Sequence, residues 1–210
     1  MNYEIAENIV AEQKENYRQK VEDIWSGKIS AQGSDKTKHG KAGELVFSEM
    51  YKLAYEQTGA GADFPKEIMK RCVGLPEEFH EDADCKCMNI KNRNNVFLGD
   101  AIKALRKIKK SGLVLIIFWY KGHRKEGNLV GIEIIKIQSS EVSTPMQKAM
   151  SKCSTYVKNR MNCIYKTREE VKTVNKKHRT PALYLNNCSN SDSDNRQVQL
   201  KLNISRLATA

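Results

Sequence analysis

One segment of the sequence is apolar at every position, the run Leu113-Val-Leu-Ile-Ile-Phe-Trp-Tyr120. It is far shorter than the ~20 residues that a membrane-spanning helix needs. A continuous apolar run of this length is typical of a strand that is buried on both faces. We therefore predict that residues 113–120 form a strand in the middle of a sheet.

The segments around this run predict the rest of the fold. Asp100 is a good N-cap for a helix over 101–110, which Gly112 ends. Other strands are predicted at 84–92, 129–138, 182–185 and 197–204, and amphipathic helices at 2–25, 43–55 and 144–177. Residues 26–38 are expected to form a loop. The predicted fold class is α/β, with one central mixed β-sheet flanked by helices and a basic α+β C-terminal extension.

Charge is divided unevenly along the chain. The 210 residues carry 36 Lys and Arg against 25 Asp and Glu, a net charge of +11. Residues 1–100 hold 14 basic and 18 acidic side chains, whereas residues 101–210 hold 22 basic and 7 acidic ones. Such segregation favours a polyanion-binding surface, most often for nucleic acid. A lysine-rich protein with solvated faces is the alternative.

The spacing of the cysteines argues against a zinc protein, and the first residues argue against a secreted one. The close pair Cys85-Lys-Cys87 is too tightly spaced for a usual zinc site, and no His pair accompanies it. We expect the six cysteines to be reduced thiols. Residues 1–7 have no basic stretch followed by an apolar one, so we expect a cytoplasmic protein without a signal peptide, and no membrane partner.

Acidic residues near a polar-X-Lys strand suggest metal-dependent phosphodiester hydrolysis. Asn89-Ile90-Lys91 is such a tripeptide, with Asp82 and Asp84 upstream of it and Glu44 and Glu49 on an earlier predicted helix. Carboxylates hold Mg²⁺, and a Lys two residues along a strand points to the same face as the polar residue. We expect Ile90 to point into the core. Singly, each of these residues also has an ordinary structural role available.

The order of these features resembles the PD-(D/E)xK nuclease superfamily, in particular its type II restriction endonucleases. Asp82, six residues, then Asn89-Ile90-Lys91 is similar in spacing to the motif of the mismatch-repair nicking endonucleases. Lys38-His-Gly40-Lys-Ala-Gly43-Glu44 is similar to the Lys-Gly-X-X-Gly sequence that precedes their Glu-bearing helix. The resemblance covers about residues 38–138. It implies a restriction-endonuclease-like core inside a single nuclease domain, residues 1–210.

This sequence departs from the family pattern at two positions. Asn89 replaces the second acid, and the family's helix Glu falls on Phe47, so Glu44 or Glu49 must replace it; Glu44 is preferred. Asp63 is an alternative first acid. The resemblance implies Glu44, Asp82, Asp84, Asn89 and Lys91 as catalytic residues, the first four of them as Mg²⁺ ligands. It implies no small-molecule cofactor.

Residues 139–210 are predicted to form a basic DNA-contacting arm. Lys and Arg reach phosphates, while Gln and Asn can read base edges. The candidate DNA-binding residues are Lys38, Lys41, Lys148, Lys152, Arg160, Arg168, Lys176, Lys177, Arg179, Arg196, Gln197, Gln199 and Lys201. We expect a Mg²⁺-dependent, sequence-specific endonuclease for double-stranded DNA, acting as a homodimer because palindromic sites are read by two-fold symmetric proteins. The alternative is a non-catalytic nucleic-acid-binding protein.

Overall fold

The computed structural model describes residues 2–31, 35–54, 62–123, 125–142, 156–157, 160–161, 182–187 and 198–207. The chain forms two compact units whose sequences interleave. Unit 1 contains Met1–Asn92, Leu113–Lys136 and Ala210, and unit 2 contains Arg93–Gly112 and Ile137–Thr209. Residues 93–112, which we expected within the catalytic core, thus group with the C-terminal residues. Both units are described below, each by itself.

Unit 1 is built on a four-stranded mixed sheet with the order β1-β5-β4-β2. Its strands are β1 (Asn2–Glu4), β2 (Ala83–Asn89), β4 (Leu113–Lys121) and β5 (Asn128–Ile137). β2 runs parallel to β4, from Ala83↔Val114 to Asn89↔Tyr120, whereas β1 is antiparallel to β5. Every residue of β4 from Leu113 to Trp119 is buried, which confirms the predicted interior strand.

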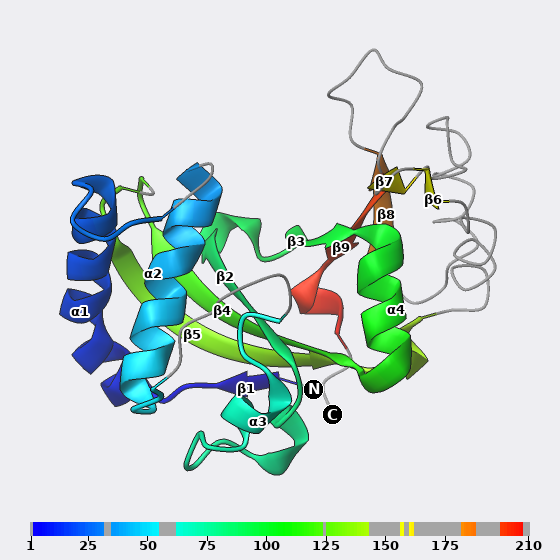
Figure 1. The fold of residues 1–210 in the computed structure, drawn as a ribbon, viewed down its shortest axis with the longest axis horizontal. Coiled ribbons are helices and arrows are strands. Elements are labelled where there is room, and N and C mark those ends of the chain that lie inside the picture. Colours follow the sequence, from blue (N-terminus) through cyan, green and yellow to red (C-terminus); the bar gives the residue numbers. More distant parts are fainter. Residues whose placement is uncertain are drawn as a thin grey trace. The chain divides into compact units, whose positions relative to one another are not determined.

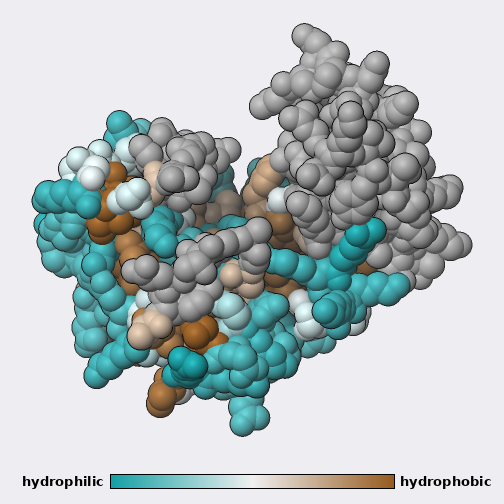
Figure 2. Space-filling model, viewed as in Figure 1, coloured by the Kyte–Doolittle hydropathy of each residue, from teal (hydrophilic) through white to brown (hydrophobic). Residues whose placement is uncertain are grey.

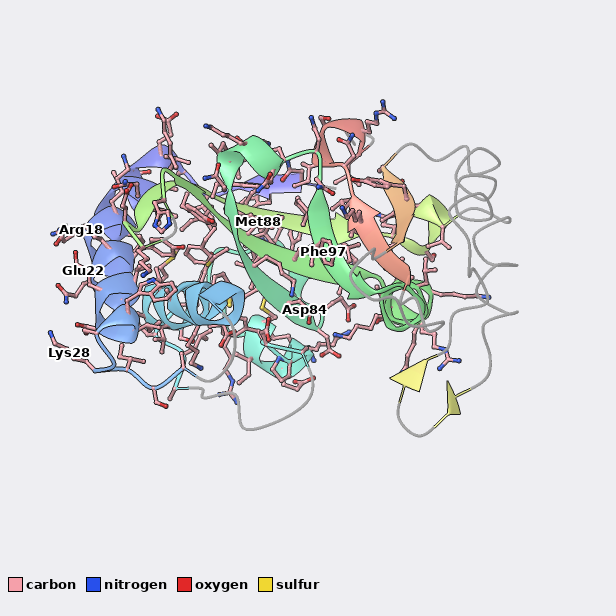
Figure 3. The ribbon with its side chains drawn as sticks, turned by 90° about the horizontal axis from the view of Figure 1, so that it is seen from above. Arg18, Glu22, Lys28, Asp84, Met88 and Phe97 are labelled. Atoms are coloured by element: carbon pink, nitrogen blue, oxygen red, sulfur yellow. The ribbon has the colours of Figure 1, made fainter. Side chains whose placement is uncertain are left out.

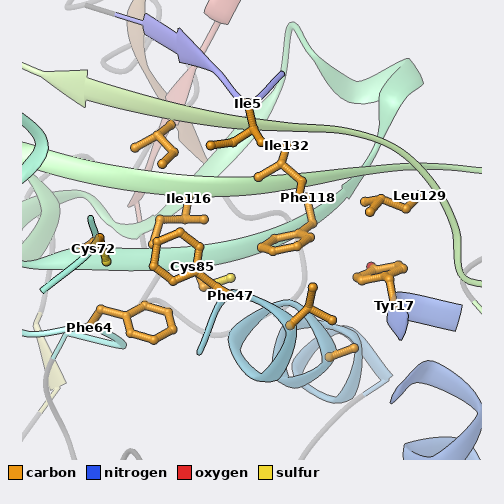
Figure 4. Close-up of a cluster of buried hydrophobic side chains, with 14 of the residues drawn as sticks. Ile5, Tyr17, Phe47, Phe64, Cys72, Cys85, Ile116, Phe118, Leu129 and Ile132 are labelled. Atoms are coloured by element: carbon orange, nitrogen blue, oxygen red, sulfur yellow. The ribbon is translucent and has the colours of Figure 1, made fainter. Parts of the chain in front are cut away.

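Two helices, α1 (Glu7–Trp25) and α2 (Asp35–Met50), pack side by side on one face of this sheet (Figure 1). Their apolar residues share one core with Cys85, Ile116 and Phe118 of the strands (Figure 4). Tyr17 stacks on Phe118 with ring centroids 5.7 Å apart. Each fully buried large apolar side chain stabilises such a core by roughly 1.5–3 kcal/mol. The outward surface of α1 is largely hydrophilic (Figure 2).

The helix predicted over 2–25 is wrong at its beginning, because residues 2–4 form a strand. Asn2 in β1 donates a side-chain hydrogen bond to Glu133 of β5. Trp119 Nε1 donates to the other oxygen of the same carboxylate at 2.7 Å, and Glu133 is only 2% exposed. α2 also begins earlier than predicted, at Asp35, so the last residues of the expected loop are helical.

No helix or strand was predicted for most of the segment between α2 and β2. It contains α3 (Lys66–Met69) and the 3-10 turn η1 (Glu77–Phe79). Met69 and Phe79 are buried in the same core as α1 and α2. Just before α3, Phe64 forms an antiparallel bridge with Ala83, with hydrogen bonds of 2.9 and 2.8 Å. This bridge attaches residues 63–64 to the first residues of β2.

Unit 2 contains a three-stranded antiparallel sheet with the order β3-β9-β8. The strands are β3 (Val96–Asp100), β9 (Val198–Leu202) and β8 (Leu183–Asn187), and η4 (Ile204–Arg206) follows β9. The helix α4 (Ala101–Ser111) packs against β3, β9 and the turn η3 (Ser139–Glu141). α4 begins where Asp100 predicted, and Gly112 ends it with a positive φ of 83°. β3 was not predicted.

The helix predicted over 144–177 is wrong at its described residues. β6 (Tyr156–Val157) and β7 (Arg160–Met161) form a two-stranded antiparallel pair there. The remaining residues of that prediction lie outside the described part of the chain. The alternating strand predicted at 197–204 is confirmed over β9, where Leu200 and Leu202 are buried and Lys201 between them is half-buried.

Candidate active site

α2 brings Glu44 close to β2 because Gly43 allows a close approach of helix and strand. A Cβ atom at Gly43 would lie 2.7 Å from Cys87 Sγ and 2.9 Å from the ring of Phe118. Glu44, the next residue, has a side chain that is 17% exposed, and its Oε2 lies 3.2 Å from Lys41 Nζ. Gly40 lies inside α2, and a Cβ atom there would meet no atom within 4 Å. The glycine pair therefore belongs to the helix itself and does not precede it.

Asp63 lies next to the beginning of β2 and is held there by a hydrogen bond. The Cys85 backbone N–H donates to Asp63 Oδ2 at 2.7 Å. This bond and the adjacent Phe64↔Ala83 bridge fix the Asp63 carboxylate to a strand twenty-two positions further along the chain. The sequence suggested Asp63 only as an alternative first acid. The structure places it beside the end of β2 that carries Asp84.

β2 carries an acid-X-Lys sequence of its own, Asp84-Cys85-Lys86. Alternate residues of a strand share a face, and Cys85 and Cys87 face Gly43 of α2. Asp84 and Lys86 therefore share the other side of the strand, and both are half-buried. Figure 3 shows Asp84 near the beginning of β2 and Met88 near its end. β2 lies at one edge of the sheet.

The electrostatics of Glu44 connect these residues. Burial raises the pKa of the Glu44 carboxyl above its usual range, and the negative charge of Asp63 raises it further. The positive charges of Lys41 and Lys86 act in the opposite direction. Asp63 and Lys86 are therefore each close enough to influence Glu44. A carboxyl whose ionisation is perturbed both by burial and by a specific charged neighbour is characteristic of functional sites.

Oxygen donors of this kind suit Mg²⁺, which prefers carboxylates. Across the described residues, however, no group of three or more His, Cys, Asp or Glu side chains is arranged to hold a metal ion. Glu44 and Asp63 form a pair with like charges, and Asp84 follows on the strand to which Asp63 is bonded. A divalent cation would relieve the repulsion within this pair, so the pair offers two of the ligands that such an ion needs.

The structure does not bring the predicted tripeptide Asn89-Ile90-Lys91 into this group. β2 ends at Asn89, and Ile90–Asn92 form the 3-10 turn η2, so the prediction that Ile90 continues the strand into the core is wrong. Asn89 Nδ2 donates to the Gly122 carbonyl, and Asn89 Oδ1 accepts the Lys91 backbone N–H, each at 3.0 Å. Asn89 therefore stabilises the turn, and Lys91 is exposed.

Two further predicted acids have structural partners. Asp82 is exposed, and its Oδ1 accepts the Lys66 backbone N–H at 2.9 Å, so it caps the first turn of α3. Glu49 forms an ion pair with Lys20 at 2.6 Å and accepts a hydrogen bond from Asn16 at 2.8 Å. Glu44 is thus the member of the Glu44/Glu49 alternative that lies with Asp63.

Most of the predicted DNA-binding residues fall on parts of the chain that the structure leaves undescribed. Lys148, Lys152, Arg168, Lys176, Lys177, Arg179, Arg196 and Gln197 lie outside the described residues. Lys38 lies in α2, Arg160 in β7 and Gln199 in β9, but their side chains are not described. Lys41 pairs with Glu44. Lys201 is paired with Phe97 across β9 and β3, and its Nζ lies 5.2 Å from the centre of the Phe97 ring.

The site residue that sequence reasoning missed is Lys86. Its signal was present, since Asp84-Cys85-Lys86 has a complete acid where Asn89-Ile90-Lys91 has an amide.

No family model matches the chain, and no curated protein and no solved structure matches it either. Among the helices that the structure describes, none is long and apolar enough to cross a membrane.

Proposed function

We propose that the protein is a Mg²⁺-dependent endonuclease that hydrolyses phosphodiester bonds in double-stranded DNA, with a restriction-endonuclease-like core. The observation that carries this proposal is the association of Glu44 and Asp63 with the Asp84-Cys85-Lys86 strand. The site differs from the one expected from sequence, because Lys86 takes the place of Lys91, and Asp63 with Asp84 takes the place of Asp82 with Asn89.

Glu44 and Asp63 are the residues that would hold the metal, with Asp84 on the strand to which Asp63 is bonded. Bound Mg²⁺ supplies a Lewis acid for a phosphoryl oxygen and lowers the pKa of its water. Lys86 stabilises negative charge on the scissile phosphate and orients the attacking water, as a fixed ammonium group does where transition-state charge develops. Asp63 keeps its position through the Cys85 N–H, and Lys41 limits the repulsion between Glu44 and Asp63.

Sequence-specific cleavage in the manner of a type II restriction enzyme, by a homodimer, is part of the same proposal. The positive charge of residues 101–210 supports DNA as the substrate, since neutralisation of phosphates supplies most of the affinity for nucleic acid. The competing proposal is a non-catalytic nucleic-acid-binding protein. It is favoured by the fact that no three candidate metal ligands are grouped within the described residues.

The test compares two lysines of similar sequence context. Plasmid DNA is incubated with Mg²⁺ or Mn²⁺ and wild-type protein, Lys86→Ala or Lys91→Ala, and the ends of the products are mapped. We expect Lys86→Ala to lower the cleavage rate by roughly 10²–10³-fold, while Lys91→Ala cleaves like the wild type. Loss of cleavage in Lys91→Ala alone would restore the site predicted from sequence. Wild-type protein that cuts no DNA across a broad panel of sequences would leave the binding protein as the function.

A further inference from the structure

The helix α4 of unit 2 has two chemically opposite faces. Ala101, Ala104, Leu105 and Ile108 are buried, and the helix packs through them against β3 and β9. At 100° per residue these four positions fall on one side of the helix. Arg106, Lys109 and Lys110 are exposed on the other side, and Lys107 is half-buried at its border.

The charged residues of α4 are all basic. The helix sequence AIKALRKIKKS contains five Lys or Arg residues and no Asp or Glu. α1, the long surface helix of unit 1, contains three basic and five acidic residues, and its Arg18 pairs with Glu15 and Glu22. Figure 3 shows Arg18 and Glu22 on the outside of α1. A charge of one sign on α4 is therefore not a general property of the surface helices.

The sign and the spacing of the charges on this face indicate what kind of partner it binds. Arg106 and Lys110 are one helical turn apart, so the exposed cations lie within ~6 Å along the axis. Duplex DNA carries one negative charge per ~1.7 Å of its axis, and a short basic helix face can contact several phosphates. A membrane surface would instead require an apolar face available for insertion, but the apolar face of α4 is packed against its own sheet.

We propose that the exposed face of α4, formed by Arg106, Lys109 and Lys110, binds the phosphate backbone of double-stranded DNA. This inference rests on the proposed function for its ligand, and it adds a contact surface outside the residues that the sequence assigned to DNA binding. The contacts are to phosphates, so they set affinity and position and carry no base specificity. Lys201 lies on the opposite side of the sheet from α4, since its strand neighbours Leu200 and Leu202 are the buried ones.

The experiment measures how DNA binding depends on salt. A fluorescein-labelled duplex of mixed sequence is titrated with full-length protein in EDTA, which prevents cleavage, over a series of KCl concentrations. The variant is Lys109→Gln with Lys110→Gln, because Gln is as good a helix former as Lys. The matched control is Lys14→Gln with Lys28→Gln, which removes two exposed charges from unit 1. A Lys109→Arg, Lys110→Arg variant retains the charge and reports on the fold.

We expect the α4 variant to bind more weakly and to reduce the slope of log K against log salt by about 1.8, which is two phosphate contacts at ~0.9 each. The control and the Arg variant should keep the wild-type slope. An unchanged slope in the α4 variant overturns the inference, as does an equal change in the control. Binding to phosphatidylserine vesicles that requires Lys109 and Lys110, with DNA binding unchanged, also overturns it.

The outcome separates this inference from the nuclease proposal. A wild-type protein that cuts DNA while the α4 variant keeps the wild-type slope retains the nuclease proposal and rejects the α4 surface. A wild-type protein that never cuts DNA while the α4 variant loses the expected part of the slope supports the α4 surface and rejects the nuclease. Wild-type protein that binds no duplex rejects the α4 surface as well.

Discussion

Asp63 Oδ2 accepts the backbone N–H of Cys85 at 2.7 Å, so a residue from the segment before α3 is bonded to the middle of an acid-X-Lys strand. The bond joins the Asp63 carboxylate to the residue that separates Asp84 from Lys86. The negative charge of the same carboxylate contributes to the raised pKa of Glu44. Asp63 therefore connects α2 and β2 electrostatically as well as through its hydrogen bond.

Asp63→Asn is expected to separate the role of Asp63 in the fold from its role in the reaction. The Asn carbonyl oxygen can still accept the Cys85 N–H, so the melting temperature should change little. The charge is lost, and DNA cleavage should fall by at least ~10²-fold, as for loss of one charge-stabilising group. The control is Asp82→Asn, whose side chain keeps an oxygen for the Lys66 N–H. Full activity in Asp63→Asn and none in Asp82→Asn would reverse our assignment.

Glu44→Gln is expected to stabilise the metal-free protein while it abolishes cleavage. Burial and the charge of Asp63 raise the pKa of Glu44, so its ionised form costs free energy in the folded state. This cost is fully present above the raised pKa of the folded state. It disappears as the pH falls below the pKa of the same carboxyl in the unfolded chain, ~4.3. The melting temperature of Glu44→Gln should exceed that of the wild type at neutral pH, and the difference should vanish near that lower pKa.

Added Mg²⁺ should reverse the order of the melting temperatures of the wild type and Glu44→Gln. Added Mg²⁺ should raise the melting temperature of the wild type more than that of Glu44→Gln, because ligand binding to the folded state stabilises it. Glu49→Gln is the control, since Glu49 pairs with Lys20 and Asn16 and its loss should not stabilise the protein. Equal melting temperatures for wild type and Glu44→Gln at every pH would show that the ionised Glu44 carboxylate does not destabilise the folded protein.

Gly43→Ala is expected to destabilise the protein where Gly40→Ala does not. The new Cβ at position 43 would meet Cys87 Sγ and Phe118 below 3.0 Å, and such overpacking costs roughly 1–3 kcal/mol. At position 40 the Cβ meets nothing, and Ala in place of a helical Gly stabilises by about 0.5–1 kcal/mol. Urea unfolding midpoints of the two variants should therefore move in opposite directions. A destabilised Gly40→Ala would contradict the helical conformation of residue 40.

Glu133→Ala is expected to be among the most destabilising polar substitutions in unit 1. It removes the acceptor for the exposed Asn2 side chain and for the buried Trp119 Nε1, and a buried donor without a partner costs about 1–3 kcal/mol. Glu133→Gln keeps one acceptor oxygen and should lose less stability. Thermal unfolding compares the two. If both variants melt with the wild type, the carboxylate does not hold β1 in place.

Local patterns predicted the elements that carry their own signal. The apolar run of β4, the helix α4 and the alternation in β9 each depend on neighbours in sequence, and all three elements are confirmed. β1 was missed because three residues have no detectable period, and their pairing comes from Ile135 and Glu133 far along the chain. β3 was missed for the same reason, since its partner β9 lies about a hundred positions later.

The candidate site was predicted in part. Glu44 was preferred because it directly follows the Gly40-X-X-Gly43 sequence, and Asp84 because it lies just upstream of the predicted tripeptide. The choice of Lys91 required β2 to continue past Asn89, but the Asn89 side chain satisfies the turn that ends it. Asp63 could not be ranked, because only the Phe64↔Ala83 bridge places it at β2, and no local pattern predicts that bridge.

The interleaving of the two units constrains how the protein is made. β1 is synthesised before the other strands that the structure describes, yet its partner β5 is the last strand of the unit 1 sheet, and residues 93–112 of unit 2 are synthesised in between. Pairings so distant in sequence close slowly. The acid-bearing strand β2 cannot pair until β4 has been synthesised. β1 cannot complete its pairing until β5 has been synthesised, as far as residue 137. During that interval the nascent chain has an incomplete sheet and depends on its early helices to keep apolar residues covered.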